Sequence, residues 1–155
     1  MEKDDFMREA IRLSEENIDD NGGPFGAVIV KDGQIIARGA NRVTASNDPT
    51  AHAEVNAIRA ACRALGSFDL SGCEIYTSCE PCPMCLGAIY WAHIDKIYYA
   101  NTQHDARDIG FDDSFIYDEL AKDKAFRRLK SEQLLPEEAS VTFARWIQKE
   151  DKIKY

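Results

Sequence analysis

The fold is decided by the stretch from Thr50 to Gly66, which reads TAHAEVNAIRAACRALG. Its alanine, valine, isoleucine and leucine residues predict a helix over 51–65 that is apolar on most of its circumference and therefore buried. Thr50 can cap the start of this helix, and Gly66 stands where a C-terminal glycine belongs. The first turn nevertheless carries His52 and Glu54. Because an unpaired buried carboxylate is very costly, a metal ion nearby is expected.

Apolar runs lie on both sides of this helix. Strands are predicted over 25–30 and 35–40, joined by a hairpin at Asp32-Gly33, and over 73–78 and 96–100. Helices are predicted over 5–18, 82–92, 114–120 and 137–149, with a loop over 101–113 and an exposed charged segment over 122–132. Strands that alternate with helices predict the α/β class, with a sheet covered on both faces.

A second motif, PCPMC at residues 81–85, supplies partners for the imidazole. Cys82 and Cys85 are three residues apart, so they share one face of a first helical turn. Thiolates are favoured at a helix N-terminus by the backbone dipole. His52 and Glu54 are two residues apart, so they point in directions about 200° apart and can share only a target beyond the end of their helix. The metal is therefore expected where the two helices begin.

One histidine and two cysteines make three protein ligands for one zinc ion. A structural zinc site is normally closed by four protein ligands, whereas three leave a position for water, which is the catalytic arrangement. Zinc can lower the pKa of that water from about 15.7 to about 7, and Glu54 is placed to accept its proton. The alternatives are a structural zinc site, with Cys79 as a fourth ligand rather than a core thiol, and a non-catalytic zinc-binding partner subunit.

Length and composition are typical of one small domain of 155 residues, 45% of them hydrophobic. The net charge of −8 argues against a nucleic-acid polymer as substrate, although a local basic patch can sit on an acidic protein. Five cysteines without a disulfide pattern predict the reducing cytoplasm. We see no signal peptide and no stretch long enough to span a membrane, so no membrane partner is expected.

The H-x-E and P-C-x-x-C motifs together resemble the cytidine/deoxycytidylate deaminase superfamily of zinc enzymes. Further blocks are similar to the bacterial guanine deaminases of this superfamily: residues 23–27, Asn41, 47–54, 76–82, 110–117 and Lys154-Tyr155. The resemblance implies a three-layer α/β/α sandwich around a central mixed five-stranded sheet. It also implies a single deaminase domain over 1–155.

The resemblance assigns roles to the quoted residues. His52, Cys82 and Cys85 are implied as zinc ligands, and Glu54 as the group that shuttles protons. Asp113 is implied to assist proton delivery to the leaving amine, although an aspartate before an apolar run can simply cap a helix.

The substrate-binding residues follow in the same way. Asn41 is implied to hydrogen-bond the purine, although asparagine at a strand end often only makes a turn. Ala53 is expected beside the purine, and Phe25 and Trp91 belong either to the core or to the pocket wall. Tyr155 is implied to close the pocket of a second subunit in a homodimer, because the segment 136–155 is exchanged between subunits in this family.

The expected reaction is hydrolytic deamination of guanine, a small-molecule purine, to xanthine and ammonia. Guanosine deaminase and tRNA adenosine deaminase are alternatives with the same zinc site, and cytidine deaminase is a weaker one. A tRNA substrate calls for a positive surface, which the net charge of −8 disfavours.

Overall fold

The computed structural model describes all residues, 1–155, as two compact units, Met1–Ile116 and Tyr117–Tyr155. The first unit holds a four-stranded sheet in the order β2-β1-β3-β4. Strand β1 (Gly26–Lys31) pairs antiparallel with β2 (Gln34–Ala40) and with β3 (Cys73–Cys79), and β3 pairs in parallel with β4 (Lys96–Asn101). The sheet is therefore mixed, as predicted.

The predicted fifth strand is wrong, because the chain turns into helices after β4. Thr102 begins α5 (Gln103–Asp108) with a reciprocal capping box, in which its hydroxyl accepts from the Asp105 backbone N–H and its own N–H donates to the Asp105 carboxylate. This pair satisfies two N–H groups at the helix start. The loop expected over 101–113 is therefore also wrong in part.

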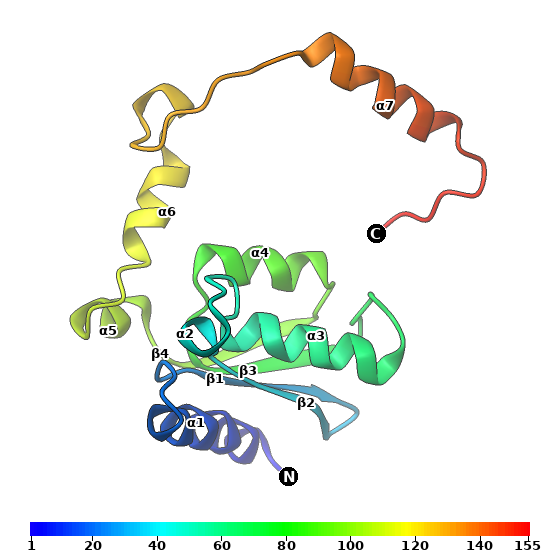
Figure 1. Cartoon of the computed structure of the whole chain (residues 1–155). Helices are drawn as coiled ribbons and strands as arrows, with labels where there is room; N and C mark the ends of the chain where they lie inside the picture. The colour runs from blue at the N-terminus through cyan, green and yellow to red at the C-terminus, as the bar shows by residue number, and fades with distance from the viewer. The chain divides into compact units, whose positions relative to one another are not determined.

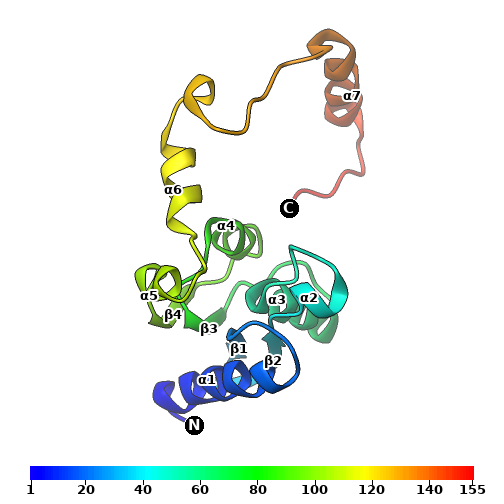
Figure 2. The ribbon, with the colours of Figure 1, turned by 60° about the vertical axis from the view of Figure 1, so that its left-hand side comes forward.

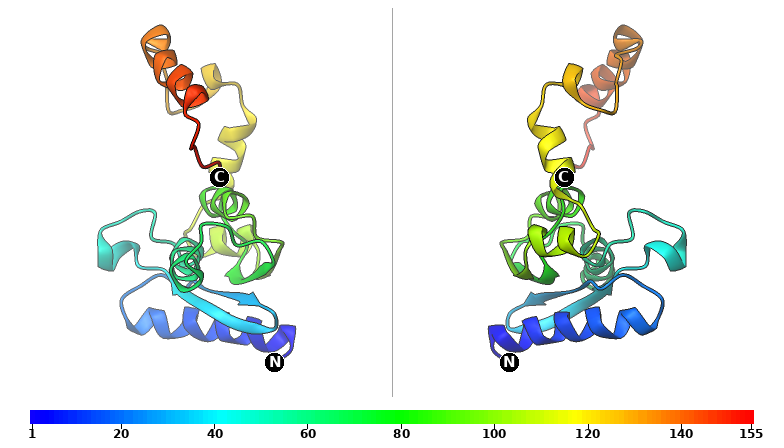
Figure 3. Two further views of the ribbon diagram at one scale, coloured as in Figure 1. Left: turned by 90° about the vertical axis from the view of Figure 1, so that its right-hand side faces the viewer. Right: turned by 90° about the vertical axis from the view of Figure 1, so that its left-hand side faces the viewer.

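Helices cover both faces of the sheet in the first unit (Figures 1 and 2). Helix α1 (Lys3–Asp19) packs on β1 and β3, whereas α3 (Ala53–Leu65) packs on β2 and β1 and has α4 (Pro83–Trp91) beside it. Figure 3 shows α1 and the pair α3 and α4 on opposite sides of the strands. The three-layer α/β/α arrangement is thereby confirmed for this unit.

Each face of β1 contributes to its own hydrophobic core. Ala27 and Ile29 pack in the cluster on the α3 side, and Val28 and Val30 pack with Phe6 on the α1 side. This division follows from the two-residue period of a strand, which sends successive side chains to opposite faces. Both faces are apolar because both are covered.

Helix α3 begins two residues later than predicted. Its N-cap is His52, because Thr50 is engaged in a turn in which its N–H and its hydroxyl both donate to Asp48 Oδ1, at 2.9 and 2.7 Å. Gly66 ends the helix in the left-handed conformation, with φ 61°, as predicted. The His52 imidazole therefore lies at the N-terminal end of α3, where the metal is expected.

Two short elements were not predicted: helix α2 (Val43–Ser46), which follows β2, and a 3₁₀ turn (Lys124–Phe126) within the segment 122–132. The helix predicted over 114–120 is confirmed as α6 (Ser114–Ala121). Within the second unit, α7 (Pro136–Gln148) contains no buried residue, so its apolar side chains are exposed. None of the helices is both long enough and apolar enough to cross a bilayer.

Candidate active site

The starts of α3 and α4 bring one imidazole and two thiols together. His52 Nδ1 lies 3.6 Å from Cys82 Sγ and 3.4 Å from Cys85 Sγ, and the three ligand atoms all lie within 4.8 Å of one another. Tetrahedral zinc with Zn–N of about 2.0–2.1 Å and Zn–S of about 2.3 Å would separate nitrogen from sulfur by about 3.6 Å. The three residues therefore fit a zinc ion without rearrangement.

The two cysteines are positioned by the predicted helix start. Cys82 is the N-cap of α4, Pro83 is its first residue, and the Cys85 backbone N–H donates to Cys82 Sγ at 3.5 Å. The hydrogen bond from the Cys85 thiol, with further bonds from His52, lowers the pKa of Cys82 to about 4. One sulfur is therefore a thiolate at neutral pH, which is the form that binds metal.

Glu54 is buried in the first turn of α3, with 6% of its surface exposed. Burial raises the pKa of this carboxyl above its ordinary value. The pKa of His52 is also raised, mainly by its hydrogen bond with Cys82. A carboxyl group whose pKa is raised towards neutral pH can both accept and return a proton beside the three metal-binding residues.

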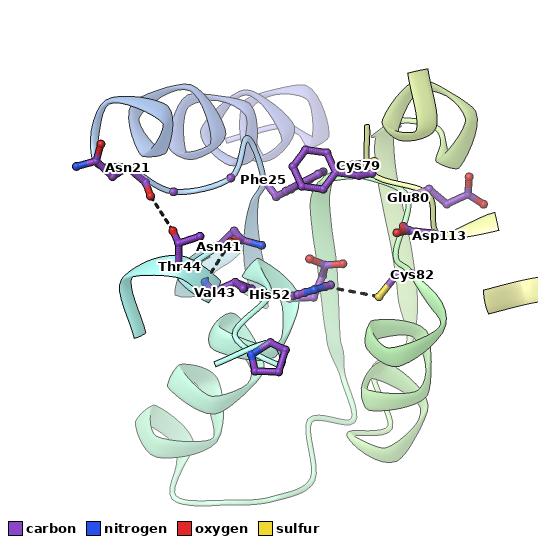
Figure 4. Close-up of a pocket in the computed structure, with 15 residues that line it drawn as sticks. Asn21, Phe25, Asn41, Val43, Thr44, His52, Cys79, Glu80, Cys82 and Asp113 are labelled. Atoms are coloured by element: carbon purple, nitrogen blue, oxygen red, sulfur yellow. Dashed lines mark hydrogen bonds between the residues drawn. The ribbon is translucent and has the colours of Figure 1, made fainter. Parts of the chain in front are cut away.

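A cavity of about 470 Å³ opens onto this cluster, and every residue that lines it belongs to the first unit. His52, Cys82 and Glu54 form one part of its wall, and Asn41 and Asp113 face the same space (Figure 4). With Phe25, the cavity wall holds six of the site residues singled out from the sequence. A cavity of this volume accommodates a purine base.

The roles left open for Asn41 and Asp113 are clarified by their neighbours. Asn41 Oδ1 accepts a hydrogen bond from the Val43 backbone N–H at 3.2 Å, which leaves its Nδ2 for other partners. At the start of α6, Asp112 Oδ1 accepts hydrogen bonds from the Ser114 hydroxyl and the Phe115 N–H. The Asp113 carboxyl lines the cavity instead, and burial raises its pKa.

Phe25 lines the cavity, together with an aromatic residue that the sequence analysis did not single out. The rings of Phe25 and Phe111 meet edge to face with centroids 5.0 Å apart. Phe111 lies in the block 110–117 that carried the family resemblance, so that block held the signal. The remaining lining residues that were missed come mostly from turns: Asn21, Gly22, Gly23, Val43, Thr44, Pro49 and Glu80.

Two of the predicted substrate-binding residues, Ala53 and Trp91, do not line the cavity. Ala53 is fully buried in the core on the α3 side and does not line the cavity. Trp91 is 66% exposed at the end of α4, so neither a core role nor a role in the wall of this cavity is correct. Tyr155 is exposed in the second unit, and its role stays a prediction.

Cys79 is buried and lines the cavity, but it is not part of the metal-binding cluster. Its Sγ donates to the Thr102 carbonyl oxygen at 3.6 Å. Burial raises the pKa of Cys79 to about 12, so it stays a neutral thiol. The interpretation of Cys79 as a core thiol therefore fits better than a fourth ligand.

Comparison with known proteins agrees with this geometry. The model of the cytidine and deoxycytidylate deaminase zinc-binding region matches residues 1–101. The chain belongs to this family. The matched range includes both motifs that supply the metal-binding cluster of His52, Cys82 and Cys85. The family and these three ligands therefore indicate the same metal, zinc.

Within this deaminase family, similarity extends over the whole chain in one case and over part of it in others. A guanine deaminase of Bacillus subtilis strain 168 is 52% identical over 156 residues, covering all of both chains. A tRNA-specific adenosine deaminase of Aquifex aeolicus is 42% identical, over 64% of this chain and 66% of its own.

Solved structures of guanine deaminases also resemble this chain. An X-ray structure of guanine deaminase from Bacillus subtilis has a TM-score of 0.97 at 52% identity and covers 100% of this chain and 99% of its own. A structure of a guanine deaminase from Nitrosomonas europaea has a TM-score of 0.70 at 36% identity, covering 72% of this chain and 65% of its own.

Proposed function

We propose that the protein is a zinc-dependent guanine deaminase, which hydrolyses guanine to xanthine and ammonia. The observation that carries the proposal is a cavity in which Glu54, Asn41 and Asp113 surround an open-sided cluster of one histidine and two cysteines. The choice of guanine rests on the similarity to a guanine deaminase over the entire chain, including the residues beyond 101 that the family model does not reach.

His52, Cys82 and Cys85 would hold the zinc ion as its three protein ligands. Bound in such a site, zinc acidifies water and so supplies a nucleophile near neutral pH. The chain offers no fourth protein ligand from Cys79, because this thiol stays neutral and donates to the Thr102 carbonyl. An open position distinguishes a catalytic site from a structural one.

Glu54 moves the protons. It accepts one from the attacking water and delivers one to the ring nitrogen next to the carbon that bears the amine. It then takes the proton of the hydroxyl group that has added to this carbon and passes it to the amine. The carbon–nitrogen bond breaks as the carbonyl of xanthine forms, and the amine leaves as ammonia. The raised pKa of this buried carboxyl suits both directions of transfer, because a general acid–base works best when its pKa lies near the operating pH.

Asn41 and the two phenylalanines bind the base. Asn41 Nδ2 can donate to an acceptor on the purine edge, because the amide is held in place by the bond between its Oδ1 and the Val43 N–H. Phe25 and Phe111 form an apolar wall on which an aromatic base can pack. Asp113 lies on the same cavity and assists proton delivery to the leaving amine.

We further propose that the protein acts as a homodimer in which residues 136–155 of one subunit cover the other, with Tyr155 closing the partner's pocket. None of the hydrophobic side chains in residues 117–155 is buried, and Phe143 and Ile147 are 75% and 72% exposed. A 13-residue helix is marginal in water without tertiary packing. A second copy of the chain would supply that packing.

The test is a substrate panel read by ammonia release from zinc-loaded protein, with guanine, guanosine, adenine, cytosine, cytidine and a tRNA anticodon stem-loop as substrates. We expect guanine to be turned over best. A matched Glu54→Gln protein should keep its zinc but lose about 10²–10⁴-fold or more in rate. Preference for guanosine or for tRNA would replace the proposed substrate, and wild-type turnover by the Gln variant would exclude the proposed proton shuttle.

A further inference from the structure

A second cavity, of about 420 Å³, lies between β2, α2 and α3. Its lining contains no aspartate or glutamate but four arginines: Arg38, Arg42, Arg59 and Arg63. The whole chain has 27 acidic and 19 basic residues, so this arginine cleft is a local exception on an acidic protein. Two carboxylates outside the lining, Glu9 and Asp48, each form an ion pair with one of these arginines, at 2.9 and 3.9 Å. The positive charge left over on the four guanidinium groups attracts an anion.

Two of the guanidinium groups come from the end of β2, and each has N–H groups to spare. Arg38 uses its Nε for Glu9, at 2.9 Å, and no bond to its two terminal nitrogens is formed. Arg42 Nη1 donates only to uncharged oxygens, at 3.1 Å to Asn17 Oδ1 and at 3.5 Å to the Asp20 carbonyl. The positive charge of Arg42 is therefore not neutralised by a carboxylate.

The other two guanidinium groups project from α3. Arg59 lies 3.9 Å from Asp48 Oδ2, which is beyond hydrogen-bond range. The Arg63 guanidinium makes no hydrogen bond or ion pair with the rest of the chain. These two residues are four apart on a helix, so they lie on one face, one turn apart. A ligand with several negative oxygens could meet both.

The arginine cleft has small residues at its base, where β2 and α3 are in close contact. Gly39, Ala40 and Ala60 line it, so little side-chain volume fills the space between the arginines. Strand and helix are in close contact here, since a Cβ on Gly39 would come within 2.3 Å of the Ala53 carbonyl oxygen. A fixed frame lowers the entropy lost when a ligand is bound.

We propose that the arginine cleft is a second binding site, for a small anion that carries two or more phosphates, such as the phosphate groups of a nucleoside di- or triphosphate. The planar fork of an arginine matches phosphate oxygens in pairs, and four forks around one cavity match a polyphosphate better than a single anion. A nucleic-acid polymer is disfavoured, because its phosphates would extend beyond the cleft over a surface with net charge −8.

The cleft is distinct from the deaminase cavity, and the proposal does not depend on the proposed activity. The two cavities share no lining residue, although Asn41 lines one and Arg42 the other. The backbone between them is fixed, since Asn56 Nδ2 donates to the Ala40 carbonyl at 2.8 Å and the Arg42 N–H to the Ala51 carbonyl at 2.9 Å.

Calorimetric titration of the full-length, zinc-loaded protein with sodium pyrophosphate and with sodium tripolyphosphate tests the proposal. We expect one saturable site whose affinity falls as salt is raised, because the attraction is electrostatic. The variant with Arg59→Gln and Arg63→Gln should bind at least about tenfold more weakly, since charge-assisted hydrogen bonds are lost. Arg8→Gln, which removes an exposed arginine outside the cleft, should bind like wild type.

A second variant tests the same site independently, in case the double arginine variant does not fold. Ser46→Glu brings a carboxylate into the cleft from α2 without removing an arginine, and it should weaken binding in the same way. The proposal is overturned if neither phosphate compound gives a saturable site, or if binding survives in both variants, which would place it at the metal. It is also overturned if a single-stranded oligonucleotide binds and the two small anions do not.

Discussion

Asp112 and Asp113 are adjacent at the start of α6, but their carboxyl groups have different surroundings. Asp112 accepts two hydrogen bonds at the helix start, whereas the Asp113 carboxyl lines the cavity and has a raised pKa caused by burial. The division between capping and chemistry is not visible in the sequence, where either aspartate could serve either purpose. It can be tested because each side chain can be changed without the other.

Asp113→Asn should lower the kcat for guanine by at least about tenfold, because the amide cannot deliver a proton to the leaving amine. Asp112→Asn is the matched control. It keeps an oxygen acceptor for the Ser114 hydroxyl and the Phe115 N–H, so both the fold and kcat should be preserved. Equal kcat values for wild type and the Asp113 variant would remove Asp113 from the mechanism.

The contribution of Glu9 to the free energy of unfolding should depend on pH. Hydrogen bonds from Arg12 and Arg38 lower the pKa of Glu9 from its usual 4.5 to about 2 in the folded protein. A lowered folded pKa stabilises the protein above the unfolded pKa, and this stabilisation is lost as the pH falls.

The difference in unfolding free energy between wild type and Glu9→Gln should therefore be largest near neutrality. It should shrink as the pH is lowered from about 4.5 to about 2. Denaturant titrations at a series of pH values measure it. A difference that is constant over this range would mean that the ion pairs of Glu9 with Arg12 and Arg38 contribute nothing.

At the scale of elements, the contact between β2 and α3 positions the active site. Gly39 lies where the strand crosses the helix, and a Cβ there would meet the Ala53 carbonyl oxygen at 2.3 Å and the Ala57 nitrogen at 2.6 Å. Both contacts are with backbone atoms, so a change of side-chain rotamer cannot relieve the clash. The same helix carries Glu54 in its first turn, so displacing it would also displace the proton shuttle.

Gly39→Ala should consequently destabilise the protein by about 1–3 kcal/mol, the usual cost of overpacking. Gly87→Ala in α4 is the control, because a Cβ there meets nothing within 4 Å and alanine is the better helix former by about 1 kcal/mol. Thermal unfolding of the two variants compares them. A Gly39 variant as stable as the Gly87 variant would show that α3 can move away from the sheet.

Elements with a strong local signal could be predicted from the sequence. Pro83 after Cys82 fixed the start of α4, and the apolar runs located all four strands. Elements set by side-chain hydrogen bonds were misplaced: the Asp48–Thr50 turn delays α3 to Ala53, and the Thr102–Asp105 box starts α5. Both hydrogen bonds are made by short polar side chains, which are as common in loops as at helix starts, so the sequence does not distinguish the two.

The site was predictable to the extent that its chemistry needs particular residue types. A histidine, two cysteines and a glutamate have few other reasons to occur in two helix starts, so the cluster was found. Residues that line a cavity wall need no particular chemistry: Val43 lines the cavity although nothing in its sequence context indicates this, whereas Trp91 is exposed. Which apolar residue faces a cavity is decided by tertiary packing, which periodicity does not encode.

At the scale of the whole molecule, the second unit has apolar side chains without a core of its own. A chain that lacks 136–155 should lose the proposed partner contact. We expect full-length protein to sediment as a dimer and the truncated protein as a monomer with little guanine turnover. Removal of Lys154 and Tyr155 alone should leave the dimer intact and lower turnover. Unchanged turnover in the shorter deletion would exclude Tyr155 from the pocket.

The central claim is that His52, Cys82 and Cys85 hold a zinc ion on which guanine hydrolysis depends. The most direct measurement is guanine turnover by protein stripped with a chelator and then titrated with zinc, with bound metal determined at each point. We expect no ammonia release from the stripped protein and activity that rises in proportion to zinc up to one ion per chain. Undiminished turnover by protein shown to be free of metal would contradict it.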